Sequence, residues 1–418
     1  MSIGYACLTV GVPNTGISHC ILKNATDENI RSITSANLSA LEAIIDYNIK
    51  NNIRLFRISS DIIPFGSHPI NQIQWWEEYR DILQQLGCKI KKAGMRVSMH
   101  PGQYTVLNST DPKVVQKAIE ELEFHDRFLT SLGMDQKSKL VLHIGGVYGD
   151  KVKAMKAFAD NYDLLSTAIK LRLIIENDDR NYNIQEVLQL SKVTGTPVVF
   201  DNLHHLLNPP EDRVTDAKWI MRCEKTWTNQ DGRQKIHYSQ QKEGRSPGSH
   251  SNTIFLPIFM AYYNELENQD LDIMLEVKDK NLSAIKCINA VIFDATAKAL
   301  EEEWARYKYF VLSRSARLYQ EIRELLKNKA SRVAKEFYAL IELAYVLPED
   351  KGAEVNAAQH VWGYISKDST KTEKNRYEKL MEAYHNNTGT ISPLKNHLLK
   401  CAEIRKLEYL IQSLYFYL

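Results

Sequence analysis

The sequence shows no sign of a disulfide framework, a thiolate metal site or a membrane segment. Its six cysteines are scattered along 418 residues with no paired C-x-x-C spacing, which excludes a disulfide-stapled scaffold and a zinc site built from paired thiolates. No run approaches the roughly 18 to 20 consecutive apolar residues of a membrane helix. The first residues also lack the basic region and apolar core of a signal peptide. We therefore expect a cytoplasmic protein with reduced cysteines.

The chain also lacks a strong charge of either sign. A formal net charge of +2 is close to neutral for 418 residues, so binding to nucleic acid would have to use a local patch rather than the overall field. With 44% hydrophobic and 25% charged residues, the composition is that of an ordinary globular protein. The length is enough for one large domain and a second one.

What the sequence does contain is a series of short apolar runs, each of which ends on a potential metal ligand. The runs RVSMH, KLVLH, LRLIIE, PVVFD, KIH and LDIMLE end in order at His100, His143, Glu176, Asp201, His237 and Glu276. With 12 histidines and 51 acidic residues in the whole chain, six such endings in a row are not expected by chance. A single residue of this kind is often a helix cap or a satisfied polar group, so only the whole set is informative.

Short apolar runs separated by longer helical patterns are typical of buried strands in a parallel sheet. Two earlier runs, IGYACL near Tyr5 and RLFRISS after Arg54, raise the number of predicted strands to eight. Helical patterns between the runs begin, for example, at Ser35, Ile73 and Pro112. Eight strands alternating with helices predict an α/β fold, the TIM (β/α)8 barrel, whose functional residues gather at the carboxyl ends of the strands. The six ligand candidates are predicted to lie at those ends.

The pattern of the chain changes after about residue 300. From about Leu312 to the C-terminus every pattern is helical, and no comparable strand run occurs. We therefore predict a barrel domain over residues 1–300 and an additional all-helical domain over residues 301–418.

The types of the candidate ligands restrict which metal ions the site can bind. Mixed imidazole and carboxylate ligands without thiolates suit zinc, manganese or iron. His204 and His250 follow in loops, and His68 lies after the second predicted strand. This is more than one ion can use, so we predict at least two ions, with Glu176 on a central strand as a natural bridge.

Clusters of two or more ions favour hydrolysis of a phosphodiester, because one ion activates water while another stabilises the leaving oxygen. A metal-dependent sugar isomerase or epimerase on the same barrel is the alternative. It can work with one ion, which would leave the additional histidines unexplained.

The ordered motifs resemble those of the ultraviolet damage endonucleases, which are relatives of endonuclease IV. The motifs are HPGQY, HIGG, IIEND, VFDNLHH, KIHYS, the later His250 and LEVKDK, and the resemblance covers roughly residues 1–300. It implies a DNA repair enzyme that nicks damaged double-stranded DNA 5′ of ultraviolet photoproducts without ATP, with some action at abasic sites. It also implies about three divalent ions. Manganese is the first candidate, and zinc and magnesium are the others.

The resemblance further assigns roles to individual residues. The eight metal ligands would serve three ions. The first ion would be held by His100, His143 and Glu176, and the second by Asp201, His237 and Glu276, with Glu176 as the bridge between the two. The third ion would be held by His204 and His250. Lys235 precedes His237 by two residues on the same strand face. It matches a lysine that the family can carry in carboxylated form, and an unmodified lysine that contacts phosphate is the alternative. The catalytic group implied is Glu176, Lys235 and His68.

Three residues are implied to contact the substrate. Gln103 and Tyr104 resemble a pair that fills the gap left when damaged nucleotides are flipped out of the duplex. Tyr5 matches a tyrosine of the lesion pocket, and a core tyrosine is the alternative. Family members tend to place an asparagine shortly after that tyrosine, whereas this chain has Leu8 and Thr9 there. Lesion preference is therefore the property in which this chain is expected to differ.

The C-terminal region resembles a bacterial helical domain of unknown function. The resemblance rests on AAQHVWGYIS from Ala357 and ISPLKNHLL from Ile391. We expect His360 and Trp362 to be core helix residues rather than parts of a site. The domain is predicted to be an accessory that binds a protein partner or grips DNA.

Overall fold

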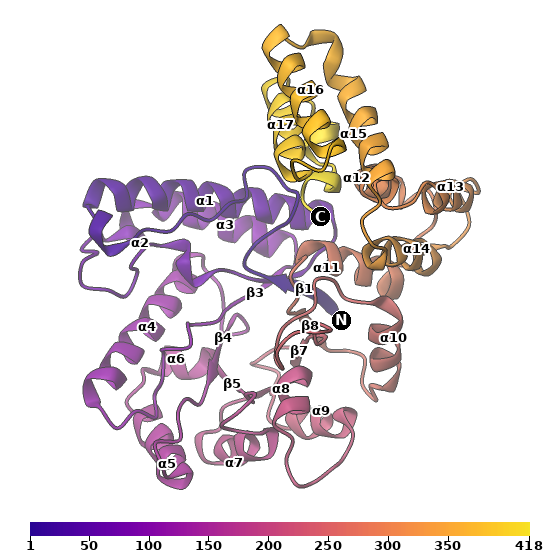
Figure 1. The fold of residues 1–418 in the computed structure, drawn as a ribbon. Coiled ribbons are helices and arrows are strands. Elements are labelled where there is room, and N and C mark those ends of the chain that lie inside the picture. Colours follow the sequence, from indigo (N-terminus) through magenta and orange to yellow (C-terminus); the bar gives the residue numbers. More distant parts are fainter. The chain divides into compact units, whose positions relative to one another are not determined.

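All eight predicted strands form, and they close into a parallel barrel in chain order from β1 to β8. The computed structural model describes residues 1–418, and Figure 1 shows helices around the strands. Pairing of β1 with both β2 and β8 closes the barrel, so the predicted TIM-like fold is confirmed. The strands are β1 (Ser2–Ala6), β2 (Leu55–Arg57), β3 (Arg96–Met99), β4 (Lys139–His143), β5 (Leu173–Glu176), β6 (Val198–Asp201), β7 (Lys235–Tyr238) and β8 (Asp272–Leu275).

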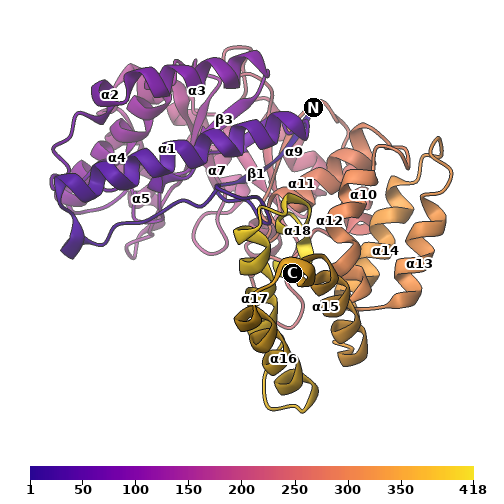
Figure 2. The same ribbon diagram turned by 90° about the horizontal axis from the view of Figure 1, so that it is seen from above.

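The helices between the strands begin and end at residues that the sequence marks. The side chain of Asp111 caps the N-terminus of α4, which starts with a proline. Gly94 and Gly133 adopt positive φ angles just beyond α3 and α4, as C-terminal glycines commonly do. Figure 2 shows α1 and α3 side by side. The helices are α1 (Asp27–Lys50), α2 (Trp75–Glu78), α3 (Arg80–Lys92), α4 (Pro112–Ser131), α5 (Lys151–Tyr162), α6 (Thr167–Arg172), α7 (Ile184–Thr194), α8 (Asn202–Leu207), α9 (Asp216–Glu224), α10 (Leu256–Glu265) and α11 (Asn281–Cys287).

The helical pattern that begins at Ile73 is interrupted at Tyr79, which separates α2 from α3. Its φ of −107° and ψ of 20° depart from helical values. The ring is buried, and the hydroxyl donates to the backbone oxygen of Arg31 at 3.2 Å. Packing of the Tyr79 side chain therefore divides a segment that the sequence pattern predicts as one continuous helix.

The strands place an apolar layer directly below the ligand candidates. Inside the barrel, Val141, Ile174 and Val199 pack together, and Leu55 packs with Ala6 and Met274. Side chains on a strand return to the same face every second residue. The next inward positions on β4, β5 and β6 are therefore His143, Glu176 and Asp201, and those on β2 and after β8 are Arg57 and Glu276.

The chain divides into two compact units. The first comprises residues 1–9, 14–254 and 258–285, and the second comprises residues 10–13, 255–257 and 286–418. The division at residue 300 that the sequence suggests stays a prediction. The all-helical character of the C-terminal region is confirmed. Its α-helices are α12 (Glu301–Leu312), α13 (Ala316–Leu325), α14 (Ala334–Val346), α15 (Lys351–Ile365), α16 (Lys371–His385), α17 (Ser392–Ile404) and α18 (Glu408–Ile411).

The helical region has an apolar core of its own, to which α15 contributes Ala357, Val361 and Ile365. Trp362 packs against this core and stacks on Tyr377, with ring centroids 4.2 Å apart. His360, in contrast, is exposed, because it lies on the side of α15 that faces away from these apolar residues. The expectation of a core residue is therefore met by Trp362 and wrong for His360. No helix of the chain is long and apolar enough to cross a membrane.

Candidate metal centre

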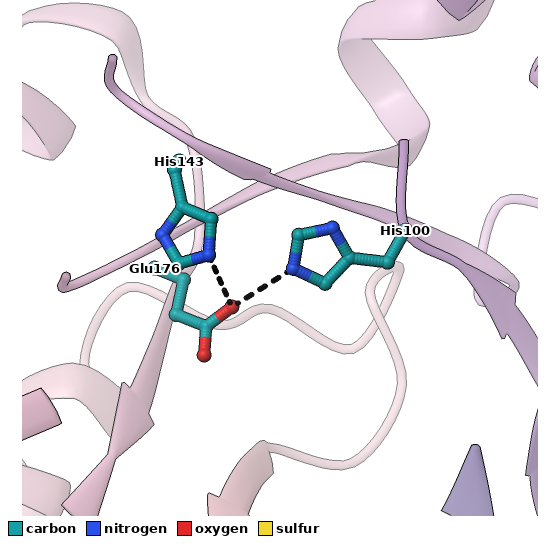
Figure 3. Close-up of side chains that lie close together, drawn as sticks. All are labelled: His100, His143 and Glu176. Carbon is teal, nitrogen blue, oxygen red and sulfur yellow. Dashed lines mark hydrogen bonds and ion pairs between the residues drawn. The ribbon is translucent and has the colours of Figure 1, made fainter. Parts of the chain in front are cut away.

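Glu176, the last residue of β5, lies at the centre of the cluster. It is almost fully buried. Its Oε2 atom lies 3.3 Å from Nε2 of His100, which follows β3, and 3.7 Å from Nε2 of His143 at the end of β4. Figure 3 shows both imidazoles directed at this one carboxylate oxygen.

The second oxygen of Glu176 faces a different pair of histidines. Oε1 lies 2.7 Å from Nδ1 of His237 on β7 and 3.7 Å from Nδ1 of His204 on α8. A carboxylate whose two oxygens face separate sets of imidazoles has the arrangement that a bridge between two ions requires.

Asp201 joins the cluster at the end of β6, where it is also the N-cap of α8. Its Oδ1 accepts the backbone N–H of His204 at 2.8 Å, while its Oδ2 is buried and has no hydrogen-bond partner. The Asn177 side chain donates to the Asp201 carbonyl at 3.0 Å and accepts its N–H at 2.9 Å. The backbone that carries Asp201 is thereby held in place by the residue that directly follows the neighbouring strand β5.

Glu276, directly after β8, connects the remaining members. Its Oε1 lies 3.5 Å from Nδ1 of His237, and its Oε2 lies 3.8 Å from Nε2 of His250. The loop that carries His250 is pinned by a bridge to Gln241. The structure thus brings all eight proposed ligands into one continuous cluster, although their roles as ligands stay predictions.

Two members of the cluster, Glu176 and His143, have pKa shifts that favour the form that binds metals. Burial raises the pKa of Glu176, but the charges of His237 and His143 and hydrogen bonds from His100 and His237 outweigh it, so the pKa lies well below its ordinary value. Burial lowers the pKa of His143 to about 4. An ionised carboxylate and a neutral imidazole are the forms that coordinate metals.

The donor set of the cluster also fits divalent cations. Ligand atoms of His100, His143 and Glu176 lie within 4.8 Å of one another, and the same holds for Glu176, Asp201 and His237. Burial raises the pKa of Asp201 to about 7, and the charge of His204 opposes this only in part. A buried carboxylate of this kind, with one oxygen lacking a partner, is well matched by a bound cation.

Lys235 lies one layer below His237, inside the barrel. It is fully buried, and its Nζ has no hydrogen-bond partner. Burial first, and then the charges of Arg96 and Arg57, lower the pKa of this amine well below its ordinary value. Lys235 and His237 share strand β7, as the sequence predicts, and the carboxylated form of the lysine stays a prediction.

The predicted substrate contacts separate into two groups. Gln103 and Tyr104 lie in the exposed loop after β3, and Tyr104 is 85% exposed. Tyr5 is instead fully buried, packs on Phe56 and donates its hydroxyl to Asn48 of α1 at 2.8 Å. This placement matches a core tyrosine, the alternative left open by the sequence, better than a contact with DNA.

His68 does not contact the other histidines in this structure. It is exposed, its Nδ1 accepts the N–H of Ile70 at 3.1 Å, and its ring lies edge-on to Phe65. A supporting role for His68 therefore stays a prediction.

Sequence reasoning missed Arg57, the last residue of β2. Its Nη2 lies 2.6 Å from Oε1 of Glu276 and 3.0 Å from Nε2 of His237. The run RLFR ends on this arginine just as other runs end on ligands. A search for strand-end residues of any polar type would have found it.

A parallel barrel that collects imidazoles and carboxylates at the carboxyl ends of its strands defines a candidate metal-dependent enzyme of the TIM-barrel class. Within that class, the chain belongs to the UV-endonuclease family, because the family model described as UV-endonuclease UvdE matches residues 2–301. Residues 308–418 match a second family, described as a protein of unknown function, DUF1722.

Individual relatives agree with this family. The chain is 43% identical over 355 residues to a UV DNA damage endonuclease of Clostridium perfringens (strain 13 / Type A), with 84% of each chain covered. This span exceeds the 300 residues of the endonuclease match, so the likeness extends into the helical region. A UV DNA damage endonuclease of Bacillus cereus (strain Q1) is 31% identical, covering 64% of this chain and 84% of the relative.

A solved structure shows the same likeness in three dimensions. The crystal structure of SacUVDE has a TM-score of 0.66 and 36% identity, covering 70% of this chain and 98% of that chain. The predicted function, an endonuclease for ultraviolet-damaged DNA, is confirmed by family membership. This decides against the sugar isomerase alternative.

Proposed function

We propose that this enzyme hydrolyses one phosphodiester bond of double-stranded DNA on the 5′ side of ultraviolet photoproducts, with some action at abasic sites. The observation that carries the proposal is the continuous cluster of eight imidazoles and carboxylates around Glu176 at the carboxyl ends of the strands. Reactions of TIM barrels take place at that end. We assign the activity to residues 1–300, working in the cytoplasm, and treat residues 301–418 as an accessory domain.

The cluster would hold about three divalent ions, manganese first among the candidates. His100, His143 and Glu176 are the proposed ligands of one ion, and Glu176, Asp201, His237 and Glu276 those of a second. His204 and His250 would hold the third. When bound, such ions lower the pKa of water and stabilise charge on phosphate oxygens.

The protein's own part is to keep these donors ionised, oriented and close together. Glu176 is buried among four histidines, with its two oxygens directed at different pairs. Asn177 fixes the backbone of Asp201. Donors that are held in place before the substrate arrives need no rearrangement during the reaction, which is how preorganised sites accelerate chemistry.

Lesion-dependent cutting tests the proposal. The enzyme is incubated with manganese and an end-labelled duplex, either irradiated with ultraviolet light or untreated. We expect a new fragment that ends 5′ of the photoproduct, only in the irradiated sample, and its loss when a chelator removes the metal. The proposal is wrong if the irradiated duplex stays intact, or if both duplexes are cut equally.

Tyr104 is proposed to stack where flipped nucleotides leave a gap in the duplex. Its ring is 85% exposed, so its removal should leave the barrel and its metal content unchanged. Stacking of a base on an aromatic ring contributes about 1–3 kcal/mol, so Tyr104→Ala should weaken binding of the irradiated duplex roughly 5- to 150-fold.

Fluorescence anisotropy with a labelled duplex measures this change. Tyr104→Phe is the matched control, because it keeps the ring and should bind like the parent. Equal affinity of Tyr104→Ala and the parent would remove Tyr104 from the contact with DNA.

For the helical region, a protein partner and a grip on DNA both remain predictions from the sequence.

A further inference from the structure

Arg57 reaches the metal centre from a strand that contributes none of the proposed ligands. In barrel order, β2 is separated from β8 by β1 and from β7 by β1 and β8. Its guanidinium nevertheless touches both Glu276, at 2.6 Å, and His237, at 3.0 Å. The side chain is only 9% exposed. This one residue therefore ties together two proposed ligands from different strands.

The chemistry of a guanidinium restricts what this contact can do. The group carries only N–H donors, has no lone pair for a metal, and is permanently charged. Arg57 can therefore act on the ion only through the ligands that it touches. It occupies Oε1 of Glu276, and the other oxygen, Oε2, is the one that lies 3.8 Å from Nε2 of His250.

Two effects of Arg57 on metal affinity oppose each other. Its positive charge repels a nearby cation, whereas its hydrogen bond to Oε1 holds the Glu276 carboxylate in one orientation. Groups that orient metal ligands from outside typically change affinity or activity by about 10- to 100-fold when removed. The contact is short, buried and directed at a single carboxylate oxygen, so we expect orientation to dominate.

We propose that Arg57 is a positioning residue of the metal centre. It holds Oε1 of the Glu276 carboxylate beside His237, so that the other oxygen, Oε2, stays free for the second ion. This inference rests on the metal-dependent function proposed above, and it adds a role for a residue that is not itself a ligand.

The test compares manganese binding by four full-length proteins: the parent, Arg57→Met, Arg57→Lys and Arg172→Lys. Arg172 is the matched control, because its side chain is 8% exposed and pairs with Asp126 at 2.7 Å in the same barrel without contacting the cluster. Calorimetric titration gives affinities, and electron paramagnetic resonance of free manganese counts the bound ions. Nicking rates are then measured at saturating manganese.

We expect Arg57→Met to bind at least one ion about 10- to 100-fold more weakly than the parent. Arg57→Lys should be intermediate, since it keeps the charge and a donor but loses the planar fork. Arg172→Lys should match the parent in affinity. A purely structural role for Arg57 predicts a lower melting temperature with unchanged manganese affinity.

The possible failures can be told apart. If the parent binds no manganese, the proposed metal-dependent function fails. If the parent binds it and Arg57→Met binds equally well or better, the function stands and the positioning role of Arg57 is wrong. If circular dichroism shows that Arg57→Met does not fold, the manganese affinity of Arg57→Lys is used instead. An affinity equal to or higher than that of the parent would contradict the positioning role.

Discussion

Replacing Glu176 by glutamine is expected to reduce the nicking rate on irradiated DNA about a thousandfold or more, which corresponds to roughly 4 kcal/mol of transition-state stabilisation. Glutamine keeps the shape of the side chain but removes the negative charge. That charge faces His100 and His143 through one oxygen and His237 and His204 through the other. Loss of this charge would weaken the binding of every ion that the carboxylate bridges.

The rate is measured at saturating manganese and substrate, so that weaker binding of either does not account for the loss. Glu123→Gln is the matched control, because it makes the same chemical change at an exposed position of α4 and should cut at the parental rate. Circular dichroism verifies that the Glu176→Gln barrel is folded. If folded Glu176→Gln cut DNA as fast as the parent, the cluster would not be the catalytic centre.

In the second compact unit, Lys286→Met should lower the free energy of unfolding by about 3–5 kcal/mol. This is the usual cost of removing one partner of a buried ion pair. Nζ of Lys286 lies 2.7 Å from Oε1 of Glu342, and the two side chains are only 3% and 6% exposed. The same oxygen accepts the backbone N–H of Leu256 at 2.9 Å. Without the lysine, the buried carboxylate of Glu342 would lose the ammonium group that balances its charge.

Denaturant unfolding of the full-length chain, followed by circular dichroism, measures the loss. The double variant Lys286→Met with Glu342→Gln is the control. It removes both charges but keeps a carbonyl oxygen for the Leu256 N–H, so most of the lost stability should return. Equal stability of Lys286→Met and the parent would mean that the ion pair contributes nothing.

The predictions that succeeded rest on short-range regularities. The runs KLVLH and PVVFD are strands because buried parallel strands need continuous apolar residues, and their ends are ordered because every strand of such a barrel points the same way. The C-terminal helical region follows from the absence of comparable runs. These features depend on residues that are neighbours in the chain.

The predictions that the sequence could not make depend on packing. Tyr5 follows a strand pattern that permits either a core position or a pocket, and only its hydrogen bond to Asn48 shows that it packs against α1. Tyr79 interrupts a helix through a contact with Arg31, far away in sequence. His360 and Trp362 lie two residues apart, yet the rotation of α15 exposes one and packs the other against the core.

The sequence by itself determined the barrel, the order of its strands and the residue types at their ends, because alternation along a strand and uniform strand direction are local rules. Only the tertiary structure decided which of those ends meet. Closure of the barrel places Arg57 against Glu276, 219 positions later in the chain, and directs the two oxygens of Glu176 at separate pairs of histidines. Such distances depend on register and curvature of the whole sheet, which no single segment encodes.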